Sequence, residues 1–521
     1  MCFEVKMPSA DLILKNATVI TVNPGQPFAG LVAVKGDRIM LVSGNDDLES
    51  VKGPDSKVID CAGKTLVPGF NDAHCHVFSF LRKLLSVDLS PAAVNSIEDI
   101  KNAIKCTAEN TPGGEWITGT DYNDFQLIEK RHPTRKEIDE VAPNHPVILS
   151  HRSLHACVLN SMALSIAGIS AETEEPPGGH IDRDLETGEP NGLLLEMLGY
   201  IRETVMPDIS EAELTRGITL ANRHYISQGI TSVQDATYVS DYKRWQRYLR
   251  FKDEGILKSR VSMMCGIETV KELKEAGLTF GSGDNHLRLG GIKIVPSMIG
   301  GQLFPSRQDL DMHVLDAQQA GFQVAIHAIQ DKMVEAVINT FEYAKSQSPQ
   351  KDMRHRIEHC SECPPNLLER LKKLRPVVVT QPPFIHYSGD RYLAMVPEEK
   401  LPFLYRFKSL LDCGLTVAAG SDSPIVPDNP LAGIYGAVTR QSETGHILQP
   451  EERISASQAL SMYTINAACA SFEEDIKGSI TEGKLADMVL LSDNPVTTPP
   501  EQIKDIRAEM TIIGGEVVFE S

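Results

Sequence analysis

The chain has 521 residues, of which 41% are hydrophobic and 23% charged, and a formal net charge of −19. This composition is that of a globular protein with a sizeable core, and the length allows roughly two to four domains. The negative charge repels phosphate backbones and anionic lipids, so we expect neither nucleic-acid nor membrane partners.

Both ends of the chain carry strand patterns. The N-terminal part contains "DLILKNATVITVN" and "GLVAVKGDRIMLVSG", which alternate with a period of two as β-hairpins do. The C-terminal part repeats this style in "GKLADMVLLSDNP" and "EMTIIGGEVVFES". We therefore predict one small β-sandwich that is built from both termini. Its two parts are residues 1–68 and 477–521, and a large domain, 69–476, lies between them.

The sequence gives two indications of the protein's compartment. Its beginning lacks the apolar core of a signal peptide, and no window approaches the ~20 apolar residues of a spanning helix. The ten cysteines are scattered, so we expect free thiols in a reducing compartment and a cytoplasmic location. The pair Cys360 and Cys363 is a lone CxxC, for which two ordinary thiols are the favoured interpretation.

The middle of the chain alternates short apolar, β-branched runs with segments of helical period. Eight such runs predict a (β/α)8 barrel of the TIM type, in which the C-terminal strand ends carry the chemistry. The runs are "TLVPGFNDAH", "ITSVQDA", "RVSMMCG", "GGIKIVPS", "QVAIHA", "HRIEHC", "VVVTQPP" and "TVAAGSDSP".

One interval is too long for a single crossover helix. About 150 residues separate the first run from the second, and structureless loops of that length are not expected in a compact domain. This interval contains helix-like stretches and the Gly/Pro-rich loop "EEPPGGHIDRDLETGEPNG". We therefore predict an inserted subdomain at about 85–215, after barrel strand one.

Polar side chains collect at the ends of these predicted strands. His74 and His76 are two positions apart, so on a strand they point the same way and can bind one metal ion. A histidine at a strand end is more often a satisfied core residue than a ligand, but six such groups converge here. Imidazole with carboxylate suits zinc or a similar cation. The six candidate ligands are His74, His76, Lys293, His327, His359 and Asp422.

Lys293 lies within an apolar strand, where burial of an ammonium group is costly. An ion pair with a buried acid is one explanation. The favoured alternative is a carbamate, in which the neutral amine has taken up carbon dioxide and becomes an anionic ligand between two metal ions. Nearby cations depress the amine pKa and so make the neutral form accessible.

The motifs "PGFNDAHCH", "HAIQD", "RHRIEH" and "AAGSDSP", with a lysine on strand four, resemble the amidohydrolase superfamily. The segments "PTRKEIDEVAPNHPVILSHRSLHACVLNSMAL" and "GEPNGLLLE" are similar to its amidohydrolase-3 branch, which contains N-substituted formamide deformylase. The resemblance runs nearly end to end. It implies a barrel hydrolase that cleaves the C–N bond of a small-molecule amide, N-formyl amine or N-acyl amine.

The resemblance also implies a role for each candidate ligand. His74, His76 and Asp422 would hold one divalent metal, most simply zinc. His327 and His359 would hold a second. Carboxylated Lys293 and a hydroxide would bridge the two metals, and Asp422 would be the general base and then the general acid.

Substrate contacts are less defined. Four residues are candidates for them, although a structural or surface role is the default for each: Tyr122, His155, Arg356 and Gln381. Arg356 lies three positions before His359, so on a regular strand the two side chains point to opposite faces. An ion pair with an acid is therefore an alternative explanation for Arg356. Positions near the expected pocket depart from the branch, because Pro296-Ser297 and Gln330 replace its usual Asp-Gly and Gly.

Two rival functions follow from the same residues. A deaminase of the superfamily would hold one metal, but it usually carries a glutamate where this chain has Gln330, and it would not need Lys293. A non-catalytic barrel would be expected to have lost ligands, whereas all six are retained. The expected partners are a small-molecule substrate and a second copy of the chain in a homodimer.

Overall fold

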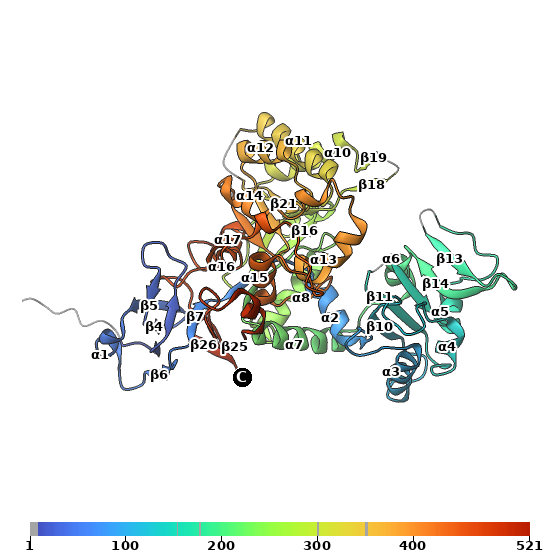
Figure 1. Cartoon of the computed structure of the whole chain (residues 1–521), viewed down its shortest axis with the longest axis horizontal. Coiled ribbons are helices and arrows are strands. Elements are labelled where there is room, and N and C mark those ends of the chain that lie inside the picture. Colours follow the sequence, from blue (N-terminus) through green and yellow to red (C-terminus); the bar gives the residue numbers. More distant parts are fainter. Residues whose placement is uncertain (1–8, 154, 177–178, 300–301, 350–352) are drawn as a thin grey trace, which may run out of the picture. The chain divides into compact units, whose positions relative to one another are not determined.

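The computed structural model describes residues 9–153, 155–176, 179–299, 302–349 and 353–521 (Figure 1). The chain forms two compact units. Unit 1 consists of Met1–Val77 and Asn222–Ser521, and unit 2 is Phe78–Ala221. Among the described residues, no helix is both long and apolar enough to cross a membrane.

An eight-stranded parallel barrel forms the centre of unit 1 and confirms the predicted fold. Its strands follow one another around the barrel in chain order, as βα repeats require. Most are buried along their whole length, because helices cover the outside and side chains fill the inside. The strands are β8 (Phe70–Cys75), β15 (Ile230–Asp235), β16 (Arg260–Gly266), β17 (Leu287–Ile294), β20 (Val324–Ala328), β21 (Arg356–His359), β22 (Val377–Thr380) and β23 (Val417–Ala419).

Helices follow most of these strands and form the outer layer. The longest is α11 (Asp331–Gln347), whose buried stripe includes Val334, Val337, Ile338 and Phe341. The helices are α8 (Tyr242–Asp253), α9 (Val270–Glu275), α10 (Arg307–Gln319), α11, α12 (Pro365–Leu374), α13 (Pro383–Met395), α14 (Phe407–Asp412), α15 (Pro430–Thr439), α16 (Ala456–Met462) and α17 (Ile465–Ala470). A short hairpin, β18 (Ser297–Ile299) and β19 (Gln302–Phe304), follows β17.

The β-sandwich combines strands from both ends of the chain, as predicted. Its apolar core is a single cluster that includes Leu14, Val34, Leu66, Met488 and Ile512. One sheet contains β5 (Arg38–Ser43), β4 (Leu31–Lys35), β1 (Leu12–Lys15) and β6 (Lys57–Asp60) in that order. The other contains β26 (Glu516–Glu520), β25 (Ala508–Ile513), β24 (Met488–Leu491), β7 (Thr65–Pro68), β2 (Thr18–Ile20) and β3 (Phe28–Ala29).

The first predicted barrel strand is in fact two strands. The run "TLVPGFNDAH" begins as β7 in the sandwich and continues as β8 in the barrel, with Gly69 between them. A Cβ at Gly69 would lie 2.2 Å from Thr231 Oγ1, so only glycine fits where the chain changes sheets. The apolar run is continuous across this point, which is why the sequence pattern did not separate the two strands.

Unit 2 follows β8 and contains a six-stranded sheet, whereas the sequence analysis named only helix-like stretches and a Gly/Pro-rich loop there. The sheet mixes parallel and antiparallel pairs, and β9 has only two residues. Such short strands leave a weak alternation signal. The strand order is β13 (His180–Arg183), β14 (Pro190–Leu195), β12 (Ala156–Leu159), β11 (Val147–His151), β10 (Ile117–Tyr122) and β9 (Val87–Asp88). The main helices are α3 (Ile97–Glu109), α4 (Arg135–Asp139) and α5 (Ser161–Ile166), while α2 (Val77–Leu85) and α7 (Glu211–Ser227) stand where the chain passes between units.

Candidate metal centre

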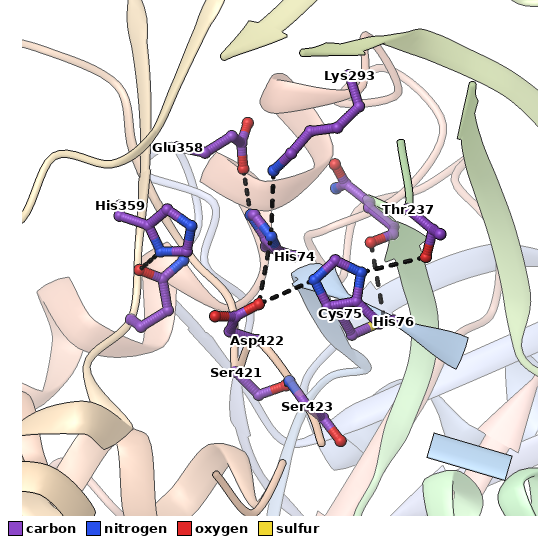
Figure 2. Close-up of polar contacts among 12 residues, drawn as sticks. His74, Cys75, His76, Thr237, Lys293, Glu358, His359, Ser421, Asp422 and Ser423 are labelled. Carbon is purple, nitrogen blue, oxygen red and sulfur yellow. Dashed lines mark hydrogen bonds and ion pairs between the residues drawn. The ribbon is translucent and has the colours of Figure 1, made fainter. Parts of the chain in front are cut away.

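The six candidate ligands all belong to unit 1 and stand at or near the C-terminal ends of barrel strands. Figure 2 shows five of them: His74, His76, Lys293, His359 and Asp422. Parallel strands bring their C-terminal ends to one face of a barrel, which explains how residues up to 348 positions apart in sequence can meet. His74 lies in β8 and His76 follows it, Lys293 lies in β17, His327 in β20 and His359 at the end of β21, and Asp422 follows β23.

Three of these residues form a compact donor group. His76 Nε2 is 3.0 Å from Asp422 Oδ1, and His74 Nε2 is 3.4 Å from the same oxygen. One ligand atom from each residue lies within 4.8 Å of the other two. Among the residues that the structure describes, this is the one group of three or more His, Cys, Asp or Glu side chains that meets this geometry.

The remaining candidates lie next to this group. Lys293 Nζ is 3.3 Å from His74 Nε2. The His359 ring centroid is 4.9 Å from that of His74 and 4.5 Å from that of His327. The structure therefore brings all six candidate residues into one continuous cluster.

Protein groups hold the outward nitrogen of three of these imidazoles. Nδ1 of His74 is 2.5 Å from Glu358, and Nδ1 of His76 is 3.1 Å from Thr237 Oγ1 (Figure 2). Nδ1 of His359 is 2.9 Å from Gln381 Oε1. Such contacts fix the orientation of a ring and leave Nε2 to face the site. The three histidines are thus oriented in the way that metal ligands are.

Glu358 itself is held by a buried arginine. Arg356 Nε donates to Glu358 Oε1 at 2.7 Å, and Arg356 Nη2 donates to the carbonyl of Ala73 at 2.8 Å. Nη1 of Arg356 donates to Gln234 Oε1 at 2.5 Å. The Arg356 and Glu358 side chains are 1% and 0% exposed, so their charges compensate each other away from water.

Backbone strain accompanies two of the candidate ligands. His359 has a φ of 71° and Asp422 a φ of 60°, a region that non-glycine residues seldom adopt. The surrounding contacts hold both, because Gln381 bonds to the His359 ring and the amide of Asp422 donates to the carbonyl of His74 at 2.7 Å. Strain of this kind concentrates at functional sites.

Burial dominates the electrostatics of the cluster. It lowers the pKa of His74 to about 3 and that of His327 to about 2, so both imidazoles are neutral and able to bind a metal. Burial also lowers the pKa of Lys293 to about 8, against the opposing pull of the Glu358 and Asp422 carboxylates. Burial alone would raise the pKa of Asp422, but the hydrogen bond from His76 and the nearby imidazoles bring it below its usual value. The site therefore combines neutral imidazoles, an ionised carboxylate and a lysine that loses its proton easily.

The donor set fits divalent metal ions. Neutral imidazole nitrogens and a carboxylate oxygen are the ligands that zinc prefers, and each of His74, His76 and His359 has the supporting contact at its other nitrogen that metal-binding histidines need. Lys293 would be a poor direct ligand as an ammonium, but its lowered pKa favours the amine that forms a carbamate.

The four predicted substrate contacts lie in different surroundings. Gln381 is buried beside His359, and its Nε2 has no hydrogen-bond partner among the described residues. The Arg356 guanidinium is paired with the Glu358 carboxylate. Pairing with an acid was the alternative to its predicted contact with substrate. Tyr122 is buried in unit 2 with its hydroxyl 2.9 Å from His132 Nδ1, and His155 is exposed there beside Glu196 at 3.0 Å. These contacts of Arg356, Tyr122 and His155 give no support to substrate binding, and all four roles stay predictions.

Sequence reasoning missed the residues that support the ligands. Glu358, Thr237 and Gln234 were not singled out, although "RIEH" places an acidic residue directly beside a predicted ligand. Asp72 was also missed. Its carboxylate accepts from the amide of His74 at 3.1 Å and from Ser421 Oγ at 2.5 Å, so it ties β8 to the segment that carries Asp422.

Comparison with known proteins agrees with this site. The profile of the amidohydrolase family matches residues 57–519. The chain is 30% identical to N-substituted formamide deformylase of Arthrobacter pascens over 98% of each chain. It is 31% identical to protein LONG AFTER FAR-RED 3 of Arabidopsis thaliana, over 98% of this chain and 92% of that one. A crystal structure described as an uncharacterized metal-dependent hydrolase from Pyrococcus furiosus shares 25% identity with a TM-score of 0.75, covering 93% of this chain and 100% of that one.

The barrel and its imidazole–carboxylate cluster define the class of metal-dependent hydrolases. Within that class, the chain belongs to the amidohydrolase family, in agreement with the resemblance seen in its motifs.

Proposed function

We propose that this hydrolase cleaves the C–N bond of a small-molecule amide, N-formyl amine or N-acyl amine, with two zinc ions as cofactors. The observation that carries the proposal is the convergence of His74 Nε2, His76 Nε2 and an Asp422 oxygen within 4.8 Å, with Lys293 and His359 beside them. The similarity to N-substituted formamide deformylase supports an N-formyl or N-acyl substrate.

Each ligand has a place in this proposal. His74, His76 and Asp422 would hold one ion, and His327 and His359 would hold the other. Lys293, as its N6-carboxylate, would contact both, which accounts for a buried lysine with an easily lost proton. Bound zinc would supply Lewis acidity to polarise the substrate carbonyl and to lower the pKa of the attacking water.

Asp422 would move the proton in this reaction. Its carboxylate is 12% exposed and faces both His74 and His76, so it can reach a reactant at the centre. It would accept a proton from the attacking water and then donate it to the leaving nitrogen. Glu358, Thr237 and Gln381 would keep the imidazoles in place, so the donor atoms need no rearrangement during the reaction.

The deaminase alternative has weaker support. Gln330 lies at the N-terminus of α11, is exposed and carries an amide, which cannot transfer a proton as a glutamate would. A single-metal mechanism also leaves Lys293 without a role. The homodimeric state and the cytoplasmic location stay predictions.

A metal assay with Lys293→Ala tests the proposal. The wild-type chain should hold about two zinc equivalents, and the variant should lose about one of them and nearly all activity against a panel of N-formyl and N-acyl amines. Lys271→Ala, at a lysine that is 88% exposed, is the control and should match the wild type. Unchanged metal content and rate in Lys293→Ala would refute the two-metal site, and absence of turnover on every amide would refute the hydrolytic function.

A further inference from the structure

A second feature of unit 1 is a cavity of about 580 Å³ at the other end of the barrel. Its wall includes His355, Val377 and Thr416, which lie at or just before the N-terminal ends of β21, β22 and β23. The candidate ligands His359 and Asp422 stand at the C-terminal ends of two of these same strands. The cavity is therefore separate from the metal centre, and its size is that of a typical small-molecule site.

The rim of the cavity is positively charged in a strongly negative protein. Among the described residues that line it, four are Lys or Arg and none is Asp or Glu, whereas the whole chain has 51 basic and 70 acidic residues. A different cavity, of about 420 Å³, lies beside the β-sandwich and has three acidic residues in its wall, Asp60, Glu509 and Glu520. A basic rim is thus a local property of the first cavity.

Three of the four basic groups have no carboxylate partner in the part of the chain that the structure describes. Arg354 pairs with Glu474 at 2.6 Å. Lys345, Lys373 and Arg375 form no ion pair with any carboxylate of the described residues, and Arg375 donates only to the carbonyl of Gly414, at 2.9 Å. Like charges that converge without counter-charges raise the local concentration of anions.

Part of the cavity wall is apolar. Phe341, Leu374 and Leu415 line it, and the His355 ring stacks on Phe341 with centroids 5.1 Å apart. Both His355 nitrogens are already used, by the amide of Val324 at 3.0 Å and by Gln318 at 2.9 Å. The wall therefore combines apolar and polar surface, while the charge that a ligand would meet comes from the rim.

We propose that this cavity binds an organic anion with an apolar body, either a carboxylate or a phosphate monoester. The apolar wall would take the body, and Lys345, Lys373 and Arg375 would take the anionic head. A free inorganic anion would leave most of the cavity unfilled. A polyanion such as nucleic acid is disfavoured by the net charge of −19.

Fluorescence titration with anilinonaphthalene sulfonate, an aromatic anion, tests the proposal on the full chain. We expect one saturable site whose affinity falls as salt is raised, because exposed charges are screened. Lys345→Glu and Lys373→Glu should each weaken binding by about fivefold, the scale expected for reversal of an exposed charge. The matched controls are Lys332→Glu on α11 and Lys372→Glu on α12, which change the net charge equally but do not line the cavity.

Competition then identifies the ligand chemistry. Octanoate and octyl phosphate should displace the dye, whereas 1-octanol of equal chain length should not, and the stronger competitor names the preferred head group. Equal displacement by octanol, or equal weakening by all four lysine variants, would overturn the proposal. An affinity that does not change with salt would also overturn it.

Discussion

Glu358 and His74 form a buried contact in which a carboxylate oxygen lies 2.5 Å from the imidazole Nδ1, with both side chains at most 1% exposed. Arg356 holds the far side of the same carboxylate. These three residues together set the direction of His74 Nε2. This is the ring atom that contacts both Lys293 and Asp422. The geometry of the centre therefore depends on a residue that would not itself touch the metal.

The first prediction concerns that residue. Glu358→Gln keeps the shape of the side chain but removes its charge, so Arg356 is left as an uncompensated buried cation and His74 loses its charged acceptor. We expect metal affinity to fall about 10–100-fold and the free energy of unfolding to fall by about 3–5 kcal/mol. Zinc titration and urea denaturation measure the two effects. Glu362→Gln, at a partly exposed carboxylate that pairs with Lys400, is the control, and equal losses in both variants would contradict this role.

The second prediction separates proton transfer from metal binding at Asp422. Asp422→Asn retains an oxygen that can bind metal but cannot accept a proton, so kcat should fall by on the order of 10²–10⁴. The metal content should fall much less than the rate. Ser423→Ala is the control, because Ser423 Oγ has no hydrogen-bond partner among the described residues. Metal analysis and steady-state kinetics on the same samples distinguish the two effects. A kcat close to that of the wild type would show that Asp422 is not the base.

The sequence predicted the barrel strands and pointed to the six candidate ligands because both leave simple local signals. Apolar β-branched runs mark buried strands, and a His, Lys or Asp at such a run stands out. Nothing comparable marked Glu358. Adjacent residues on a regular strand point to opposite faces, so alternation placed Glu358 away from His359. The left-handed backbone of His359, with φ at 71°, breaks that alternation and lets both side chains reach His74.

The residues that link segments distant in sequence were also beyond prediction. Asp72 contacts Ser421, 349 positions later, and no periodicity within either segment indicates that contact. The need for glycine at position 69 is similar, because it arises from the close approach of Thr231 on the neighbouring strand. Local patterns therefore predict most barrel strands of unit 1, whereas the supporting contacts of the site arise from close approaches between elements.

The third prediction concerns the closure of the barrel at Gly420. A Cβ at this position would lie 2.6 Å from the amide nitrogen of His74 and 2.7 Å from its Cβ, so Gly420→Ala must displace β8 from the segment after β23. We expect a stability loss of about 1–3 kcal/mol and weaker zinc binding, because His74 and Asp422 move apart. Gly44→Ala is the control, since its added Cβ meets nothing within 4 Å. Tight zinc binding by Gly420→Ala would show that this approach does not fix the site.

The last prediction concerns the ion pair between the barrel and the β-sandwich. Arg260, at the start of β16, donates from Nε to Asp487 Oδ2 at 2.6 Å and from Nη2 to Oδ1 at 2.9 Å. Their side chains are 8% and 5% exposed, and Asp487 also accepts from the amide of Gly514 at 2.8 Å. Removal of one partner leaves the other charge buried without compensation, so Arg260→Met and Asp487→Asn should each cost about 3–5 kcal/mol.

The double variant should cost clearly less than the sum of the two single losses, because it leaves no uncompensated charge. Urea denaturation of the four proteins of this cycle gives the coupling energy. Glu275→Gln, which breaks an exposed pair with Lys271 at 3.9 Å, should change stability by less than about 1 kcal/mol. Strict additivity of the Arg260 and Asp487 losses would show that the two side chains act independently.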